Sequence, residues 1–340
     1  MAGSSPKSIP SPPPAGDDGQ PHAHAHADVE ADTYSDAGVT TSVTSSVFDY
    51  EYDNGRRYHA YRAGQYLLPN DEKEQERLDI THHVFLLSLN GEPCVTKLEN
   101  PSHILDLGTG TGIWAVDVGD LYPSATVIGT DLSPIQTPWV PPNVQFQVDD
   151  ATLEWTFPKD HFDFIHARTL AGAIQDWPSL LKSAYDHLKP GGFLEVAEGR
   201  ADFWCDDDTL TEDLATWTWL TEFRRLSAPL GFDIAPKLPA LIESAGFVDV
   251  AQTEKVIPLG TWPKDKALKE VGRWFRVQFI EMALEAYSLA LFTRMGGWKI
   301  EEFQVLVAKV KQELKTNKIH LYTYSSFTTA MKPKTAAASS

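Results

Sequence analysis

The fold depends on the stretch His103-Ile104-Leu105-Asp106-Leu107-Gly108-Thr109-Gly110-Thr111-Gly112-Ile113-Trp114. It begins as an apolar run of strand length, turns through alternating glycines and leads into apolar residues at helical spacing. Glycine at such a turn permits positive φ and lets a ligand approach the backbone. The N–H groups at the start of the helix can then receive an anionic group such as a carboxylate. The stretch therefore predicts a strand, a loop that holds a cofactor, and a helix.

Two classes of cofactor use such a loop. Residues 110–115 satisfy the dinucleotide pattern G-x-G-x-x-G/A, so the spacing alone does not exclude NAD. Asp106 extends the pattern to D-x-G-x-G-x-G, which resembles motif I of the class I S-adenosylmethionine (SAM)-dependent methyltransferases. The resemblance implies that Asp106 organises the loop near the methionine end of SAM. The glycines that it implies for cofactor binding are Gly108, Gly110 and Gly112.

Composition limits the partners. With 340 residues, of which 42% are apolar, the chain can hold one large or two small domains. A net charge of −18 would repel phosphate backbones and anionic lipids, so we expect neither nucleic acid nor membrane as a partner. No apolar run approaches the roughly 20 residues that span a bilayer, and the first residues lack a signal pattern. We expect a cytoplasmic or nuclear protein. Its two cysteines suggest reduced thiols and no metal site.

The first 47 residues have the composition of a disordered tail. They are rich in Pro, Ser, Gly, Ala and His, and hold six acids against Lys7. Such an acidic tail suits binding of a protein partner. We therefore expect one ordered domain at 48–340.

The segment 48–90 is expected to cover the cofactor as a lid. Aromatic rings and arginines precede Pro69, and an amphipathic helix follows with Asn70 or Asp71 as its N-cap. Surface packing against the core is an equally good reading of this composition. The residues expected to reach SAM from the lid are Tyr58, Tyr61 and Arg62.

The same segment carries a second resemblance. The run Arg56-Arg57-Tyr58-His59-Ala60-Tyr61-Arg62-Ala63-Gly64-Gln65-Tyr66-Leu67-Leu68-Pro69-Asn70-Asp71-Glu72, followed by Arg77-Leu78-Asp79, resembles the entry segment of the fungal LaeA-like methyltransferases. That group includes regulators and pathway enzymes of secondary metabolism. The likeness continues to about Glu198 and weakens beyond it. It indicates a SAM-binding domain and says little about the methyl acceptor.

Acids follow two further predicted strands. The run 125–131 ends in Asp131, whose carboxylate can accept both ribose hydroxyls, with Leu132 beside it. A cap or turn residue before Ser133 is the alternative role for Asp131. The run 144–151 alternates as a strand does. The family resemblance places adenine at its end, where we favour Asp150 with Ala151 and keep Asp149 as the competitor.

Residues 162–170 predict a fourth strand, and His166 or Arg168 at its end would face the sulfonium or the acceptor. His166 is the candidate general base, although a histidine on a strand is more often a hydrogen-bonded structural residue. Tyr185 and Lys189 match the Y-x-x-x-K pair of short-chain dehydrogenases. We reject that reading because Lys189 is expected in a helix-stop turn, where a cation complements the helix dipole.

The second half completes the fold. Helices are expected at 209–226, 236–245 and 265–315, and strands at 193–198, 247–258 and 319–329. Asp206 to Asp208 are expected to form a helix N-terminal cluster rather than a metal site. Together the chain predicts an α/β fold with a doubly wound, seven-stranded, mostly parallel sheet and a helical insertion at 265–315.

Aromatic residues in and near this insertion are candidates for the acceptor pocket, because aromatic walls suit both a positive methyl group and a planar acceptor. The alternative is ordinary packing between helices. The candidates are Trp204, Trp217, Trp274 and Phe275.

These patterns predict a SAM-dependent methyltransferase that acts on a small secondary metabolite at oxygen or nitrogen. The alternative is a LaeA-like nuclear regulator that acts through protein partners. An NAD enzyme is the third reading.

Overall fold

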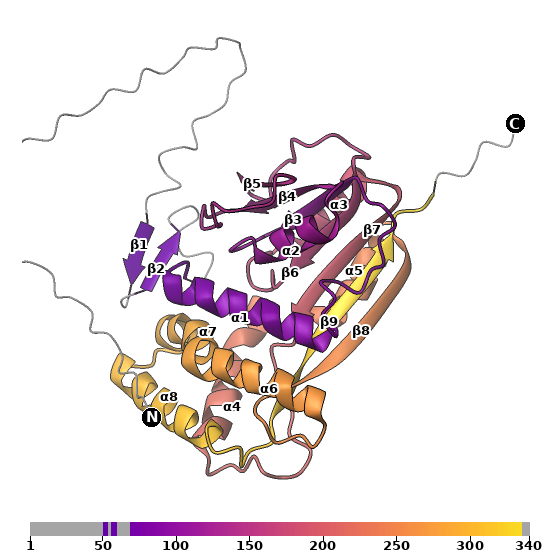
Figure 1. Cartoon of the computed structure of the whole chain (residues 1–340). Helices are drawn as coiled ribbons and strands as arrows, with labels where there is room; N and C mark the ends of the chain where they lie inside the picture. Colours follow the sequence, from indigo (N-terminus) through magenta and orange to yellow (C-terminus); the bar gives the residue numbers. More distant parts are fainter. Residues whose placement is uncertain (1–49, 54–55, 60–68, 335–340) are drawn as a thin grey trace, which may run out of the picture. The chain divides into compact units, whose positions relative to one another are not determined.

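The computed structural model describes residues 50–53, 56–59 and 69–334. Its main feature is a seven-stranded sheet in the order β5-β4-β3-β6-β7-β9-β8 (Figure 1). The strands are β3 (His103–Leu107), β4 (Thr126–Asp131), β5 (Val144–Val148), β6 (Phe162–Arg168), β7 (Leu188–Gly199), β8 (Val248–Pro258) and β9 (Tyr322–Met331). Only β9 is reversed within this sheet, antiparallel to both of its neighbours. The doubly wound, mostly parallel sheet predicted from the sequence is confirmed.

The chain builds this sheet outward from β3. β4 and β5 extend it on one side, and the chain then crosses back so that β6 pairs with the other side of β3. Ligands of open α/β sheets bind beyond the carboxyl ends of the strands at such a reversal. Asp131 and Arg168, the last residues of β4 and β6, lie at this edge.

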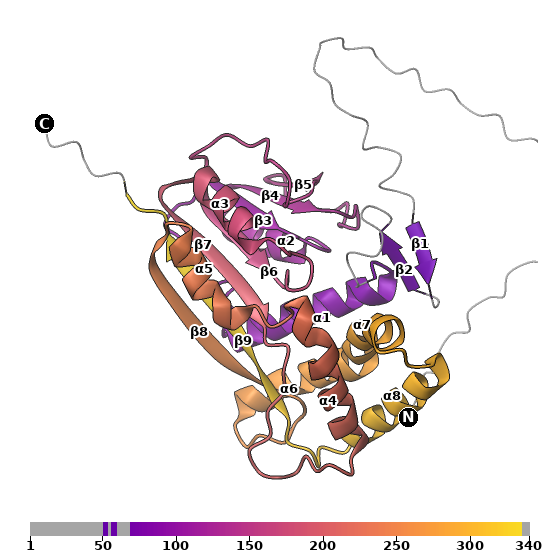
Figure 2. The same ribbon diagram turned by 180° about the vertical axis from the view of Figure 1, so that it is seen from behind.

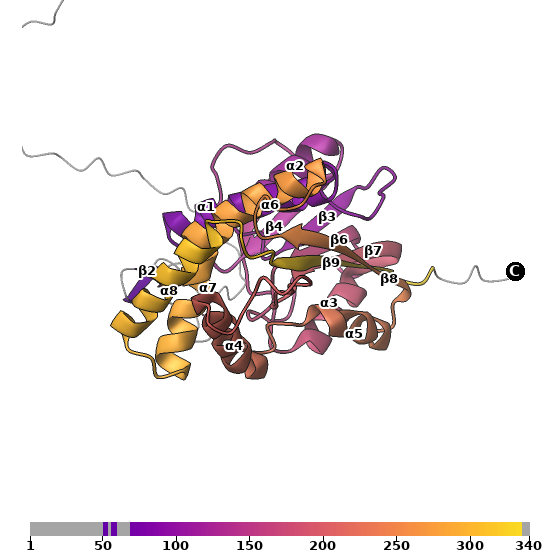
Figure 3. The same cartoon turned by 90° about the horizontal axis from the view of Figure 1, so that it is seen from below.

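Helices cover both faces of the sheet. α1 (Glu72–Ser88), α2 (Ile113–Leu121) and α6 (Lys266–Gln278) lie on one face, and α3 (Trp177–His187) and α5 (Leu238–Ser244) lie on the other (Figure 3). The helices α1, α3 and α6 each begin at an aspartate whose carboxylate accepts a backbone N–H three residues further on. For α1 the cap is Asp71, one of the two residues predicted for it.

A second group of helices, here called the helical layer, packs beside α1 (Figures 1 and 2). It comprises α6, α4 (Ala215–Ser227), α7 (Leu284–Ala290), α8 (Ile300–Leu314) and the π-helical turns η4 (Phe279–Ala283) and η5 (Leu291–Met295). Trp219, Phe279 and Phe292 belong to its apolar core, which is separate from the core beneath the sheet around Leu105 and Ile165. No helix among residues 69–334 is long and apolar enough to cross a bilayer.

Three segments differ from the prediction. β7 begins at Leu188 and includes residues 189–192, because the backbone of Gly191 and Gly192 bonds to that of Lys332. Lys189 lies in this strand and pairs with Asp163 at 2.8 Å instead of facing a helix end. α4 begins at residue 215 rather than 209, and β9 starts and ends later than expected.

The acids Asp206 to Asp208 do not begin a helix, contrary to the prediction. Asp207 accepts a hydrogen bond from the Thr209 hydroxyl at 2.8 Å and contacts the His320 ring. Asp206 accepts one from the Tyr322 hydroxyl at 3.0 Å. These acids therefore connect the segment before α4 to the start of β9. No set of three or more His, Cys, Asp or Glu side chains in the described part of the chain has the arrangement of a metal site.

Candidate functional site

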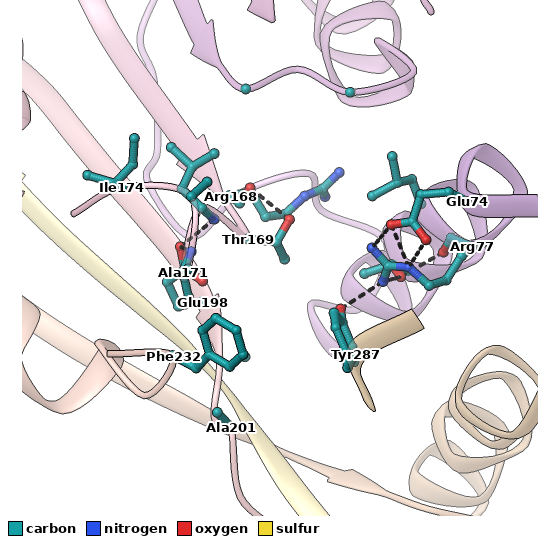
Figure 4. A pocket seen from close by; sticks show the side chains of 18 of the residues that line it. Glu74, Arg77, Arg168, Thr169, Ala171, Ile174, Glu198, Ala201, Phe232 and Tyr287 are labelled. Carbon is teal, nitrogen blue, oxygen red and sulfur yellow. Dashed lines mark hydrogen bonds and ion pairs between the residues drawn. The ribbon is translucent and has the colours of Figure 1, made fainter. Parts of the chain in front are cut away.

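A cavity of about 570 Å³ opens at the carboxyl edge of the sheet and extends to the helical layer. Figure 4 shows part of its wall, with side chains from α1, α7 and the ends of β6 and β7. The predicted cofactor residues that line it are Gly108, Gly110, Asp131, Leu132, Asp149, Asp150, Ala151 and Arg168. Asp106 and Gly112 are outside this wall, one behind the glycine loop and one at its end.

The glycine loop is held from behind by Asp106. The carboxylate of Asp106 accepts a hydrogen bond from the Thr109 hydroxyl at 2.6 Å, and the backbone N–H of Thr109 donates to Thr130 at 2.9 Å. Gly108, Gly110 and Gly112 have φ of +63°, +59° and +82°. Asp106 is buried, so it shapes the loop without facing the cavity.

Asp131 connects the glycine loop to the end of β4. Its carboxylate accepts the N–H of Gly110 at 2.8 Å and that of Ser133 at 2.9 Å. Burial raises its pKa to about 6, although both N–H donors oppose the shift. Asp131 therefore shapes the turn before Ser133 and also lines the cavity, where its role as a ligand stays a prediction.

Asp149 and Asp150 follow β5, and both line the cavity. Asp150 accepts the backbone N–H of Thr152 at 2.9 Å and its hydroxyl at 2.7 Å. Asp149 accepts the N–H of Asp150 at 2.8 Å. The choice between the two for adenine stays open.

His166, the candidate general base, is enclosed and absent from the cavity wall. Its Nδ1 lies 2.7 Å from an Asp106 carboxylate oxygen, and its ring stacks on the Trp114 indole with centroids 3.7 Å apart. Its side chain is 1% exposed. The surroundings of His166 therefore fit a hydrogen-bonded structural residue better than a general base.

Arg168 lies at the end of β6 and is supported by a chain of polar groups. An arginine can only donate, so its guanidinium donates to His82 Nδ1 at 3.1 Å, and His82 Nε2–H donates to Asp117 at 2.8 Å. Burial is the largest cause of a lowered pKa at His82, consistent with this neutral form. Burial also lowers the pKa of Arg168 to about 10, so it remains a cation at neutral pH. Sequence reasoning gave His82 no role.

A buried charged cluster on α1 was also missed. Arg77 donates from Nε and Nη2 to Glu74 at 2.9 and 2.7 Å, and from Nη1 to the Tyr287 hydroxyl of α7 at 2.9 Å (Figure 4). Arg77 and Glu74 are 2% and 3% exposed and line the cavity. Their i, i+3 spacing was the available signal, but in sequence such a pair is typical of a surface helix.

Glu198 lies near the end of β7 and accepts the backbone N–H groups of Leu170 at 2.7 Å and Ala171 at 3.2 Å. It lines the cavity, and burial raises its pKa to about 8. The sequence places it as an acid at the end of an apolar strand, which is the signal that also marked Asp131.

The aromatic wall differs from the prediction. Phe275 lines the cavity, but Trp204, Trp217 and Trp274 do not. Trp274 lies on the outer side of α6, where its indole N–H donates to Glu270 at 3.1 Å. Trp204 packs on Tyr322 and Tyr324 of β9. The aromatic residues of the observed wall are Phe85, Phe203, Trp219, Phe223, Phe232, Phe275, Phe279, Tyr287 and Tyr324.

The entry segment is described in part. β1 (Tyr50–Asp53) pairs antiparallel with β2 (Arg56–His59), and Arg56 fixes this pair to the start of α1 through Asp71, at 2.5 Å. Tyr61, Arg62 and the side chain of Tyr58 lie outside the described residues.

The sheet order, the glycine loop and the acids after β4 and β5 define a class I SAM-dependent methyltransferase. The Methyltransferase domain family matches residues 71–252. Methyltransferase pytC of Aspergillus terreus is 43% identical over 80% of this chain and 84% of its own length. The secondary metabolism regulators LAE1 of Cochliobolus heterostrophus and laeA of Aspergillus fumigatus are 38% and 37% identical over 83% of this chain, and over 94% and 76% of their own lengths. The chain belongs to the LaeA-like family of fungal methyltransferases, and its cofactor is SAM.

Proposed function

We propose that this protein transfers the methyl group of SAM to an oxygen or nitrogen of a small, planar secondary metabolite. The observation that carries the proposal is one continuous cavity. It joins the acids at the carboxyl edge of the sheet to the aromatic side chains of the helical layer, so it has room for a donor at one end and an apolar acceptor at the other.

The residues at the sheet edge suit the parts of SAM. Asp131 would accept the ribose hydroxyls, and Asp150 or Asp149 would accept the adenine amine. The methionine end would lie against the glycine loop, with its carboxylate toward Arg168. Among the described residues, His82 Nδ1 is the one hydrogen-bond acceptor of the Arg168 guanidinium, which leaves donors for an anion.

SAM supplies an activated methyl group, so the protein chiefly aligns the acceptor and excludes water. The aromatic wall favours a planar acceptor and stabilises positive charge through the faces of its rings. Incubation with labelled SAM and a metabolite extract, followed by mass identification of the labelled products, tests this function. Absence of label in any small molecule, with SAM bound, would contradict it.

Replacing Asp131 by alanine should weaken SAM binding 10- to 100-fold, about 1.5 to 3 kcal/mol, because a charge-assisted pair to the ribose is lost. Calorimetry measures the affinity. Asp120→Ala, at an exposed position on α2, is the matched control and should bind SAM as the wild type does. A loss of less than twofold for Asp131→Ala would exclude Asp131 as a ribose ligand.

SAM affinity should also depend on pH through Asp131. The ionised carboxylate accepts the ribose hydroxyls, and its pKa of about 6 means that the protonated fraction grows below that pH. Affinity should be constant above pH 7 and fall by up to about tenfold per pH unit below 6. Calorimetry between pH 5 and 8 should show this fall for the wild type and not for Asp131→Asn.

A second candidate function is regulation of secondary metabolism through a protein partner. The relatives named as secondary metabolism regulators favour it. A partner that co-purifies with the full chain and is lost when residues 1–47 are removed would support regulation. Stoichiometric methylation of a metabolite would support the enzyme.

A further inference from the structure

Glu198 is a buried acid in the cavity wall. One of its carboxylate oxygens accepts hydrogen bonds from the protein backbone, and the other accepts none from the described residues. Oε1 accepts the backbone N–H groups of Leu170 and Ala171, which follow β6 (Figure 4). Among the described residues, Oε2 has no hydrogen-bond partner, although the side chain is 1% exposed. Oε2 is not among the enclosed side-chain atoms that lack a partner, and Glu198 lies on the cavity wall, so this oxygen is open to the cavity and can accept a hydrogen bond from a ligand donor.

Aromatic side chains share the cavity wall with Glu198. Phe232, Trp219 and Phe223 contribute to the same wall, and Phe232 packs against Gly172, just beyond the backbone that Glu198 holds. A planar ring fits between such side chains, and a polar substituent on that ring would need a partner at the wall. Glu198 offers an acceptor there.

We propose that Glu198 is the general base for a phenolic or enolic hydroxyl acceptor. This inference rests on the proposed methyl transfer. Oε2 removes the hydroxyl proton, and the electron pair of the O–H bond stays on the acceptor oxygen. That oxygen forms a bond to the methyl carbon of SAM while the carbon–sulfur bond breaks and its pair goes to sulfur. The proton ends on Glu198.

The ionisation of Glu198 suits this role. Burial raises its pKa to about 8, near enough to a phenol's ordinary value of about 10 for efficient proton transfer near neutral pH. The other ionisable groups on the wall are Glu74, Arg77, Asp131, Asp149, Asp150, Arg168, Asp176, Arg200, Tyr287 and Tyr324. Burial is the largest cause of a raised pKa at Tyr287, and Glu198 adds to it. When SAM is saturating, the titration of Asp131 no longer affects how the rate of methyl transfer depends on pH.

The substitution Glu198→Gln tests the assignment, because the amide oxygen can keep both backbone hydrogen bonds while the base is lost. At saturating SAM, transfer of label to acceptors in a metabolite extract should fall about 100-fold. SAM affinity should change less than twofold. The wild-type rate should rise about tenfold per pH unit up to pH 8 and then level off, whereas the variant's profile should be flat.

The control is Glu195→Gln, another buried acid of β7, which accepts the N–H groups of Val95 and Thr96 and does not line the cavity. Thermal unfolding of both variants identifies any loss of folding. Glu195→Gln should transfer label at the wild-type rate per folded molecule. A Glu198→Gln rate within threefold of the wild type would overturn the proposal.

Binding of 2-naphthol, 2-naphthylamine and naphthalene, followed by tryptophan fluorescence, gives a readout that does not require turnover. The wild type should prefer the naphthol to naphthalene at least fivefold, and Glu198→Gln should lose this preference. Equal affinity for the naphthol and naphthalene, or a preference for the amine, would overturn the hydroxyl assignment. Failure of the wild type to bind SAM would instead overturn the proposed function.

Discussion

Arg77→Met is expected to destabilise the protein by about 3 to 5 kcal/mol, the usual effect of removing one partner from a buried ion pair. Arg77 gives Glu74 its close hydrogen bonds, and the remaining ion pair of Glu74 with Arg56 is 4.0 Å long. The Tyr287 hydroxyl would lose its partner as well. Urea unfolding, followed by tryptophan fluorescence, measures the change.

Two controls separate a buried pair from a loss of charge alone. Lys73→Met removes a partly exposed lysine from its pair with Glu285, at 3.6 Å, and should cost less than about 1 kcal/mol. The double variant Glu74→Gln with Arg77→Met leaves no buried charge unpaired, so it should recover most of the loss. A double variant as unstable as Arg77→Met would show that packing of the arginine side chain dominates.

The sequence cannot show that this pair is buried. An i, i+3 pair of acid and base on a helix is usually exposed, and α1 reads as a surface helix by its own pattern. The pair is buried because the helical layer, whose residues come some 200 positions later, packs against α1. That contact is tertiary, so no local pattern contains it.

Local patterns did predict the sheet edge. Apolar runs that end in a glycine turn or an acid predicted β3, β4 and β5 and the residues that follow them. The prediction was possible because each run and its turn or acid lie within a few residues of one another. The same signal at Glu198 was available, yet that acid received no role. His166 shows the opposite failure: its residue type suggested chemistry, but β6 places it between Asp106 and the Trp114 ring.

Which tryptophan and phenylalanine side chains of α4 line the cavity depends on the face of the helix on which each one lies. Residues four apart share a helix face, and residues two apart do not, so Trp219 and Phe223 face the cavity while Trp217 does not. Tryptophan content alone could not select among these side chains.

Gly112→Ala is expected to cost about 2 to 5 kcal/mol, from about 1 to 2 for positive φ and about 1 to 3 for overpacking. Gly112 is the N-cap of α2 with φ +82°, and a Cβ there would overlap the Phe146 ring of β5. The ring also lies against Gly129 of β4, so it has little room to move. Displacement of the loop should weaken SAM binding at least tenfold in the molecules that remain folded. Urea unfolding and calorimetry measure the two effects.

Gly91→Ala is the matched control for this substitution. Gly91 has φ +92°, but a Cβ there would have nothing within 4 Å, so only the conformational cost of about 1 to 2 kcal/mol is expected. Adding Phe146→Leu to Gly112→Ala should relieve the overlap and restore part of the SAM affinity, because the ring is the obstacle. Equal losses in the two alanine variants would mean that the Phe146 ring can move aside. The close approach of β5 to the glycine loop would then not be what fixes the loop's shape.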